Sequence, residues 1–508
     1  MLLGHRFGAL VEPATGRVWT SAEITRRVST RAAQHRAGGL QRGDRVFIHF
    51  GNCNEFFVEV LAAWRVGACV VPIDPAFTPF EIETLAAWAR PQLSVWFDPP
   101  GADSVAAMER SGVETVALAG LDTTAAAEAT RPTGVHLDDD ALILFTSGTT
   151  GDPKGVVHTH RSLQARWSSL RDHLGVDAFE RTLCILPTHF GHGLICNSLF
   201  PWLAGCDLYV QPPFRPETLV TLGETVDEHG ITFLSSVPAV WRLALRISRA
   251  PTIPSLRRVC IGSAPLSESL WRSVQEWSGA PEVLNAYGIT ETGSWLAGTT
   301  VDGFEPEDGL VGVPWGGVVR VLRRGEPGAE SDPEALCAPD ELGHVWVSTP
   351  ALMRGYLDRD DLTEKVVADG WFATGDIGTL DAHGRLYLRG REREEINKGG
   401  LKVYPADIDT AIESFPATAD VCAFAFEDLL LGEEVGVAVV LHDDAPDTMR
   451  ALHAWTVERL AKHQVPRRWY LLSAIPRTSR GKVNRATVAN QCANETPLSV
   501  AALRGTST

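Results

Sequence analysis

Residues 146–155 (TSGTTGDPKG) have the composition of a phosphate-binding loop, with three glycines, four hydroxyl side chains and one lysine. They follow the apolar run 141–145, which predicts a buried strand. Glycines let successive backbone N–H groups converge on an anion, hydroxyls donate further hydrogen bonds, and Lys154 can neutralise phosphate charge. The loop lacks the GK[ST] ending of a Walker motif, which disfavours an ordinary ATP hydrolase. A surface turn is the alternative that this composition leaves open.

Four later segments place charged or hydroxyl residues among glycines. They are residues 262–266 (GSAPL), 285–293 (NAYGITETG), 371–378 (WFATGDIG) and 476–485 (PRTSRGKVNR). Each segment alone is consistent with an ordinary turn or an exposed basic loop. All four follow a phosphate-type loop in the same chain, and this makes ordinary turns or exposed loops a much weaker interpretation.

Together these segments resemble the motifs of the adenylate-forming superfamily of acyl-CoA synthetases, peptide-synthetase adenylation domains and luciferases. TSGTTGDPKG followed by VVHTH resembles the superfamily's signature loop, and the ordered motifs span about residues 141–485. The resemblance implies that a carboxylic acid and Mg-ATP give acyl-AMP and pyrophosphate, after which a nucleophile displaces AMP. It also implies an α/β fold, with a large N-terminal body of layered sheets and helices, a small β-rich subdomain, and a small mobile α+β C-terminal domain.

The resemblance also assigns residue roles, with ATP and Mg²⁺ as the implied cofactors. It places Tyr287 near adenine, Thr290 at a phosphate, and Glu291 on Mg²⁺, a hard cation that prefers oxygen ligands. Asp376 would accept hydrogen bonds from both ribose hydroxyls, and Lys482 would stabilise the carboxylate and the α-phosphate as they meet. The catalytic residues are then Lys482, Thr290, Glu291 and Lys154. The implied nucleotide site comprises Thr146, Ser147, Gly148, Thr149, Thr150, Gly151, Lys154, Gly262, Ser263, Ala264, Asn285, Ala286, Tyr287, Gly288, Thr290, Asp376, Arg391 and Lys482.

Residues 186–197 (LPTHFGHGLICN) resemble the superfamily's acyl-pocket segment. Phe190 stands at the gate position, with His189 the alternative if the register slips by one residue. Gly191 stands where amino-acid-activating relatives carry an aspartate, which disfavours a free α-amino acid as substrate. The bulky residues favour a cyclic or aromatic carboxylate, although a tryptophan is more often core and His192 could be a satisfied buried histidine. The predicted pocket consists of Phe190, His192, Ile195, Trp241, Ile261, Ser294 and Trp295.

Residues 397–403 (NKGGLKV) resemble the loop that serves the second half-reaction, in which Gly399 and Gly400 allow a narrow substrate arm to approach. A plain turn is the alternative. Arg393 occupies the hinge position, where many members carry aspartate or lysine. We expect a thiol acceptor, either coenzyme A or the phosphopantetheine of an acyl or peptidyl carrier protein, with an amine as the rival. A catalytically inactive nucleotide-binding protein is a further alternative, against which Glu291 and Lys482 argue.

Strand-like and helix-like runs alternate along the chain. Apolar runs at 45–50, 69–73 and 141–145 alternate with a helical pattern at 55–66, which favours α/β layers. Further on, runs 376–380 and 385–388 predict a hairpin around 381–384. The charged run 389–395 predicts an interdomain linker, and Pro405 would open a helix that continues through Phe415. We therefore expect an N-terminal adenylation domain at 1–392 and a mobile C-terminal domain at 393–508, carrying the catalytic lysine.

Composition limits the domain organisation and the classes of binding partner. The 508 residues exceed the usual size of a single core. With 46 basic and 63 acidic residues, the net charge of -17 disfavours nucleic acid as a partner. Nine cysteines without a CxxC pair predict buried free thiols. No apolar window reaches a membrane-spanning length, so we expect no membrane insertion and a cytoplasmic location.

Overall fold

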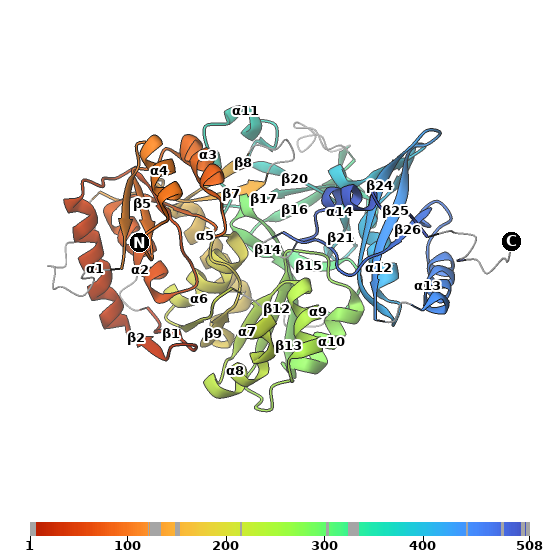
Figure 1. Cartoon of the computed structure of the whole chain (residues 1–508), viewed down its shortest axis with the longest axis horizontal. Coiled ribbons are helices and arrows are strands. Elements are labelled where there is room, and N and C mark those ends of the chain that lie inside the picture. The colour runs from red at the N-terminus through yellow and green to blue at the C-terminus, as the bar shows by residue number, and fades with distance from the viewer. Residues whose placement is uncertain are drawn as a thin grey trace.

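The computed structural model describes residues 7–119, 121, 134–147, 153–213, 216–300, 304–323, 335–442, 445–478, 482–498 and 503. Within these ranges the chain forms three β-sheets with helices packed around them. Figure 1 shows a large body, coloured from red through green, and a smaller unit of blue elements at one end. This mixed α/β architecture, with a small α+β unit after the large body, confirms the predicted fold class.

The first sheet has seven strands and a parallel centre. Its spatial order is β18 (Gly355–Tyr356), β8 (Pro153–Thr159), β7 (Asp140–Ser147), β4 (Cys69–Pro72), β3 (Arg45–Ile48), β5 (Leu93–Trp96) and β6 (Glu114–Ala117). Val46, Phe47 and Ile48 in its middle are fully buried, as parallel strands covered on both faces require. The three apolar runs predicted as strands correspond to β3, β4 and β7.

Five helices lie around this sheet (Figure 1). Local sequence sets their ends: Thr78 and Glu81 form a capping box ahead of the third helix, and Gly67 ends the second in the left-handed conformation. The second of these helices confirms the helical pattern predicted at 55–66. The five helices are α1 (Ser21–Ala37), α2 (Asn54–Val66), α3 (Pro79–Ala89), α4 (Ala102–Arg110) and α5 (His160–Leu174).

The second sheet has 14 strands, with a parallel part and an antiparallel part. The parallel part and its hairpin are β2 (Arg17–Trp19), β1 (Leu10–Glu12), β10 (Asp207–Val210), β9 (Arg181–Cys184), β11 (Phe233–Ser236), β12 (Arg258–Gly262) and β13 (Glu282–Ile289). The antiparallel part is β14 (Ser294–Gly298), β15 (Leu310–Pro314), β21 (Leu386–Arg391), β20 (Trp371–Leu380), β17 (Gly343–Ser348) and β16 (Val318–Leu322), with β19 (Val367–Ala368) beside β20.

The carboxyl ends of β11 and β12 lie side by side next to the middle of β13, because Ser236 pairs with Ile261 and Ile261 with Asn285. This edge of a parallel sheet is where α/β proteins commonly bind ligands. The helical segments of this part are η1 (Asp177–Phe179), the π-helix η2 (His192–Leu199), α6 (Phe200–Leu203), α7 (Pro216–Val220), α8 (Leu222–His229), α9 (Pro238–Ile247), α10 (Glu268–Ser278), η3 (Thr290–Thr292) and α11 (Asp360–Thr363).

The third sheet forms the C-terminal unit. It contains β23 (Leu401–Val403), β22 (Ile396–Lys398), β25 (Gly432–Leu441) and β24 (Thr418–Asp428), with β26 (Arg468–Leu471) beside β25. Its helices are α12 (Pro405–Glu413), α13 (Pro446–Arg459) and α14 (Arg485–Cys492). The predicted helix from Pro405 is therefore present as α12, and its C-terminal end lies two residues before Phe415.

The predicted hairpin around 381–384 is present as β20 and β21. The predicted linker is shorter than expected, because β21 continues to Arg391, which pairs with Asp376 on β20 and forms an ion pair with it. The connection to the C-terminal unit therefore begins at the short 3₁₀ turn η6 (Glu392–Glu394).

All nine cysteines are free thiols, and six of them are buried, which confirms the absence of disulfides and most of the predicted burial. Cys53, Cys206 and Cys337 are partly exposed instead. Among the described residues, no helix has both the length and the apolar character that crossing a membrane would require.

A buried charge cluster fixes α1 against α2. Arg31 forms an ion pair with Glu59, and His35 lies 3.0 Å from the same carboxylate, with all three side chains at most 3% exposed. Burial alone would raise the pKa of Glu59, but the charges of Arg31 and His35 outweigh it and lower that pKa to about 2. The carboxylate is therefore ionised in the folded protein, and its loss would leave a buried guanidinium without its counter-charge.

Glu59→Ala is expected to destabilise the body by about 3–5 kcal/mol, because it leaves Arg31 buried and unpaired. Urea unfolding followed by tryptophan fluorescence measures this loss. Because the folded pKa lies below the ordinary 4.5, the contribution is complete above pH 4.5 and disappears as the pH falls through about 2. The matched control is Glu83→Ala at an exposed ion pair; equal losses in both variants would contradict the prediction.

Candidate active site

Tyr287, Asp376 and Arg391 meet at the junction between the two parts of the second sheet. The hydroxyl of Tyr287 donates a hydrogen bond to Asp376 Oδ2, and Arg391 Nε lies 2.9 Å from Asp376 Oδ1. The main-chain N–H of Asp376 also donates to the hydroxyl of Thr374, 3.0 Å away. Burial, and then the charge of Asp376, raise the pKa of Tyr287 well above its ordinary value. The charge of Asp376 likewise raises the pKa of Arg391.

This arrangement follows from strand pairing. Asp376 and Arg391 stand opposite each other on β20 and β21, and Tyr287 lies on β13, three strands away through β14 and β15. A buried carboxylate held by a phenol and a guanidinium presents fixed acceptor oxygens. Such oxygens can accept hydrogen bonds from two neighbouring hydroxyl groups, which is the role predicted for Asp376 at a ribose.

Glu291, Tyr356 and Lys154 form a second cluster. The hydroxyl of Tyr356 donates to Glu291 Oε1 at 2.8 Å, and the ammonium of Lys154 lies 5.4 Å from the centre of the Tyr356 ring. Burial, and then the charge of Glu291, raise the pKa of Tyr356 above its ordinary value. Pairing of β18 with β8 brings Tyr356 beside the strand that carries Lys154. Sequence reasoning missed Tyr356, which lies in no recognised motif.

The segment that holds Thr290 and Glu291 is fixed from two elements. His158 Nε2 lies 2.7 Å from the carbonyl oxygen of Thr290, and burial lowers the pKa of His158 to about 4. The fully buried guanidinium of Arg166 on α5 donates to the carbonyl of Thr292 at 3.2 and 3.0 Å. His158 belongs to the VVHTH run beside the phosphate loop, so the motif itself was the signal for its importance.

The predicted adenine edge lies at the carboxyl end of β12 and at the adjoining middle of β13. Gly262 pairs with Ala286, and a Cβ at Gly262 would come within 2.4 Å of the Ala286 carbonyl oxygen. Ser263 has a positive φ of 69°, a strained conformation that is most often found at functional sites. Ala264 follows and is exposed. Asn285 uses its side-chain amide internally, donating to the carbonyl of Leu310 at 2.7 Å.

Gly288 is packed too tightly for a side chain, because a Cβ there would lie 2.1 Å from the carbonyl oxygen of Ser294. Thr146 lies at the end of β7, where its hydroxyl is 3.4 Å from the carbonyl of Lys154. Four predicted phosphate-loop residues lie outside the described part of the chain, as does the side chain of Ser147. The four are Gly148, Thr149, Thr150 and Gly151.

His192 is held by two serines on the second sheet. Its Nε2 lies 2.7 Å from the hydroxyl of Ser235, and its Nδ1 lies 2.9 Å from the hydroxyl of Ser263. Ser235 donates its own proton to the carbonyl of Cys260 at 3.2 Å, so Nε2–H is the donor to Ser235 and Nδ1 accepts from Ser263. Burial first, and then the positive charge of Lys482, lower the pKa of His192 to about 3.

Trp295, another predicted pocket residue, lies against His192. The Trp295 ring meets it edge-on at 5.4 Å, and Ser294 adopts a positive φ of 73°. A Cβ at Gly191 would lie 3.6 Å from the Ser294 Cβ. Ile195 and Ile261 are fully buried, and Phe190 is nearly so.

Trp241 packs edge-on against Trp277 in the hydrophobic core, with ring centres 5.4 Å apart. That packing matches the alternative in which Trp241 serves the core. The alternative gate residue, His189, lies 3.3 Å from the carboxylate of Asp74.

Lys482 reaches this region from the C-terminal unit. Its main-chain N–H donates to the Thr478 hydroxyl at 3.2 Å, and its carbonyl accepts from the Thr478 N–H at 2.8 Å. Its charge contributes to the lowered pKa of His192, so the lysine lies near the predicted acyl pocket. The predicted hinge residue Arg393 is exposed on the 3₁₀ turn that follows β21. Gly399 and Gly400, with φ of 59° and 90°, form the tight turn between β22 and β23.

Two family models match the chain: AMP-binding enzyme over residues 6–357, and AMP-binding enzyme C-terminal domain over residues 407–482. This chain belongs to the AMP-binding enzyme family. The prediction of an adenylate-forming enzyme is therefore confirmed.

Relatives extend the match over nearly the whole chain. An oxalate–CoA ligase of Arabidopsis thaliana is 29% identical, with 89% of each chain covered. The structure of ATP-bound MatB from Rhodopseudomonas palustris has a TM-score of 0.85 and 27% identity, covering 96% of both chains. The o-succinylbenzoate CoA synthetase MenE of Bacillus subtilis, in complex with the acyl-adenylate OSB-AMP, has a TM-score of 0.81 and 26% identity over 96% of both chains. MenE has also been solved with ATP and a magnesium ion. These names agree with the predicted enzyme class, an AMP-forming acid–thiol ligase.

The side chains around Glu291 fit a magnesium site with few protein ligands. Mg²⁺ commonly takes one or two protein carboxylates and completes its shell with phosphate oxygens and water. Glu291 offers one carboxylate oxygen beyond the one that accepts from Tyr356, with Lys154 nearby for the phosphates. Across the described residues there is no cluster of three or more histidine, cysteine or acidic side chains that could hold a metal alone.

Asp376→Asn is expected to weaken ATP binding roughly tenfold or more, because it replaces an ionised acceptor of two hydrogen bonds by a neutral amide. Isothermal titration with ATP measures the dissociation constant without relying on turnover. The control is Asp369→Asn at an exposed turn ahead of the same strand. An unchanged dissociation constant in Asp376→Asn would contradict the predicted ribose contact.

Proposed function

We propose that this enzyme activates a carboxylic acid with ATP to form acyl-AMP and pyrophosphate, and then transfers the acyl group to the thiol of coenzyme A. The observation that carries the proposal is the cluster in which Tyr287 donates to Asp376 and Arg391 pairs with it, because the carboxylate oxygens suit the ribose hydroxyls of ATP. The effect of the Lys482 charge on the pKa of His192 supports placing this lysine near the predicted acyl pocket. A separate cation is needed there because the acid and the α-phosphate are both negatively charged.

Each cluster then has a distinct task in the first step. Asp376, Tyr287 and Arg391 fix the ribose end of the nucleotide, while Thr290 and Lys154 hold its phosphates. Glu291 would hold Mg²⁺, which offsets the charge that develops on departing pyrophosphate. Lys482 stabilises the carboxylate oxygen and the α-phosphate oxygens as the new O–P bond forms.

The second step uses the other face of the C-terminal unit. We propose that residues 1–392 form the adenylation domain and that residues 393–508 rotate about Arg393, withdrawing Lys482 and presenting Gly399 and Gly400. The exposed 3₁₀ turn at the end of β21 and the left-handed glycine pair support this assignment. The CoA-ligase relatives favour coenzyme A over a carrier protein or an amine as acceptor.

We propose a compact acid, with a single ring or a short chain, as the acyl substrate. The aromatic hypothesis rested on Trp241 and Trp295, and of these Trp295 lies beside His192 while Trp241 packs on Trp277. Both ring nitrogens of His192 are already hydrogen-bonded to serines, so this side chain contributes a fixed, neutral surface to the pocket wall. A fixed wall of buried, well-packed side chains limits the length of the acid.

Pyrophosphate exchange into ATP, screened over single-ring acids, short mono- and dicarboxylates, α-amino acids and long-chain acids, tests the first half-reaction. We expect exchange with a single-ring or short acid and none with α-amino acids. Products formed from the active acid with coenzyme A and with simple amines then test the acceptor. Absence of exchange with every acid would contradict the ligase assignment, and amide as the sole product would contradict the thiol acceptor.

Lys482→Ala is expected to slow pyrophosphate exchange by about 10²–10³-fold, because a positioned cation at the reacting anions is lost. ATP affinity is held by other residues and should stay within about twofold. The matched control is Lys462→Ala, an exposed lysine of the same unit. Wild-type exchange by Lys482→Ala would contradict the catalytic assignment.

A further inference from the structure

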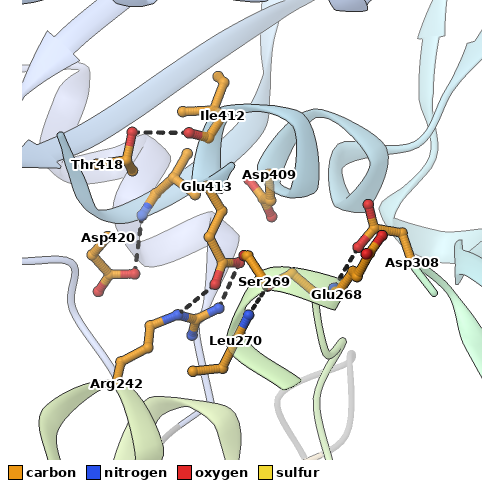
Figure 2. A network of polar contacts seen from close by, with 12 residues as sticks. Arg242, Glu268, Ser269, Leu270, Asp308, Asp409, Ile412, Glu413, Thr418 and Asp420 are labelled. Atoms are coloured by element: carbon orange, nitrogen blue, oxygen red, sulfur yellow. Dashed lines mark hydrogen bonds and ion pairs between the residues drawn. The ribbon is translucent and has the colours of Figure 1, made fainter. Parts of the chain in front are cut away.

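Helix α12 of the C-terminal unit meets the body at an ion pair between Arg242 and Glu413 (Figure 2). Arg242 on α9 donates from Nε and from a terminal nitrogen to the two oxygens of Glu413, at 2.9 and 2.7 Å. The two side chains are 23% and 16% exposed, so the pair is largely shielded from water. Bidentate pairs of this kind are stronger than typical exposed ion pairs.

The surroundings of this pair are acidic. Asp308 accepts a hydrogen bond from the main-chain N–H of Glu268 at the start of α10, 2.7 Å away. Burial first, and then the charges of Glu268 and Glu413 among others, raise the pKa of Asp308. Without Arg242, the negative charge of Glu413 would repel the carboxylate of Asp308, because no positive charge would offset it. The contact between the units at this point therefore depends on the guanidinium.

The same helix holds the C-terminal side of the lysine loop. One turn before Glu413, Asp409 lies 2.7 Å from Arg485, the first residue of α14 and three residues after Lys482. Arg485 also donates to the carbonyl of Ala423 at 2.8 Å and reaches Glu394 beside the predicted hinge at 3.1 Å.

The N-terminal side of the loop is fixed in the same manner. Arg477 binds Asp420 on β24 at 2.7 and 2.8 Å. Two anchored arginines thus bracket Lys482, and both of their carboxylate partners, Asp409 and Asp420, belong to the C-terminal unit.

On the other side of the contact, Arg242 lies on a helix that is close in the chain to a residue of the predicted acyl pocket. Its helix α9 follows β11 directly, and β11 carries Ser235, the partner of His192. The ion pair therefore links the helix that follows β11 to the helix whose Asp409 anchors the C-terminal side of the lysine loop. Its two residues lie on opposite sides of the connection that begins at Glu392.

From this geometry we infer that Arg242–Glu413 is a positioning latch: it holds Lys482 over the acyl pocket for adenylate formation and opens before acyl transfer. The inference rests on the proposed two-step function. A rotation about Arg393 separates the two side chains, whereas the ion pairs Asp409–Arg485 and Asp420–Arg477 lie within the rotating unit and survive. Breaking the latch lowers the population competent for the first step and removes an obstacle to the second.

The test compares Arg242→Gln, Glu413→Gln and the exchanged pair R242E/E413R. Adenylate formation is timed by rapid quench with ATP and the active acid, and acyl transfer is timed separately from preformed acyl-AMP and coenzyme A. We expect each single variant to slow adenylate formation about five- to thirtyfold, with acyl transfer unchanged or faster. The exchanged pair should restore most of the lost rate, because the attraction returns with reversed polarity.

Arg110→Gln, at an exposed ion pair of the body, is the matched control and should match wild type in both steps. Thermal unfolding of all variants verifies that the fold is retained. Equal slowing of both steps, or no rescue in R242E/E413R, would overturn the latch. Failure of the wild-type protein to form any acyl-adenylate would instead overturn the proposed function, so the two failures are distinguishable.

Discussion

Electrostatic repulsion between a carboxylate and a triphosphate is the constraint on which the other features depend. The protein itself carries a net charge of -17, so it has to gather positive charge locally at the site. Arg391 is neutralised in place by Asp376, and Lys154 stands beside Tyr356 and Glu291. In the proposed function the cation at the acyl pocket is Lys482, which belongs to the C-terminal unit. In the account proposed here, rotation of that unit adds the cation for the first step and removes it for the second.

The predicted acyl pocket contains a polar side chain that is neutral and fixed. His192 is a buried, uncharged imidazole whose two nitrogens are committed to Ser235 and Ser263. Trp295 covers it edge-on. In such a weakly polarisable environment a single ammonium acts over a longer distance than in water. The same rigidity explains why the acid bound here should be compact, because little of the wall can move aside.

The sequence predicted those parts of the site that lie within contiguous motifs. Asp376, Tyr287 and Glu291 were found because neighbouring glycines and hydroxyls formed recognisable segments, and the strands around them followed from apolar patterning. Tyr356, Arg166 and the Arg242–Glu413 pair could not be found in this way, because they reach the site through pairing and packing between segments up to about 170 residues apart. Isolated arginines and tyrosines carry no local signal of such partners. The extent of β21 was also missed, because its last residues are charged and resemble a linker.

The most direct test of acyl-adenylate chemistry is isotope transfer from the acid to AMP. With the active acid labelled with ¹⁸O in both carboxylate oxygens, one turnover with ATP and coenzyme A should yield AMP that carries one ¹⁸O atom, seen by mass spectrometry. This follows because the carboxylate oxygen bonds the α-phosphorus and stays with it when the thiol displaces AMP. AMP without label, or release of ADP and phosphate in place of AMP and pyrophosphate, would contradict the account.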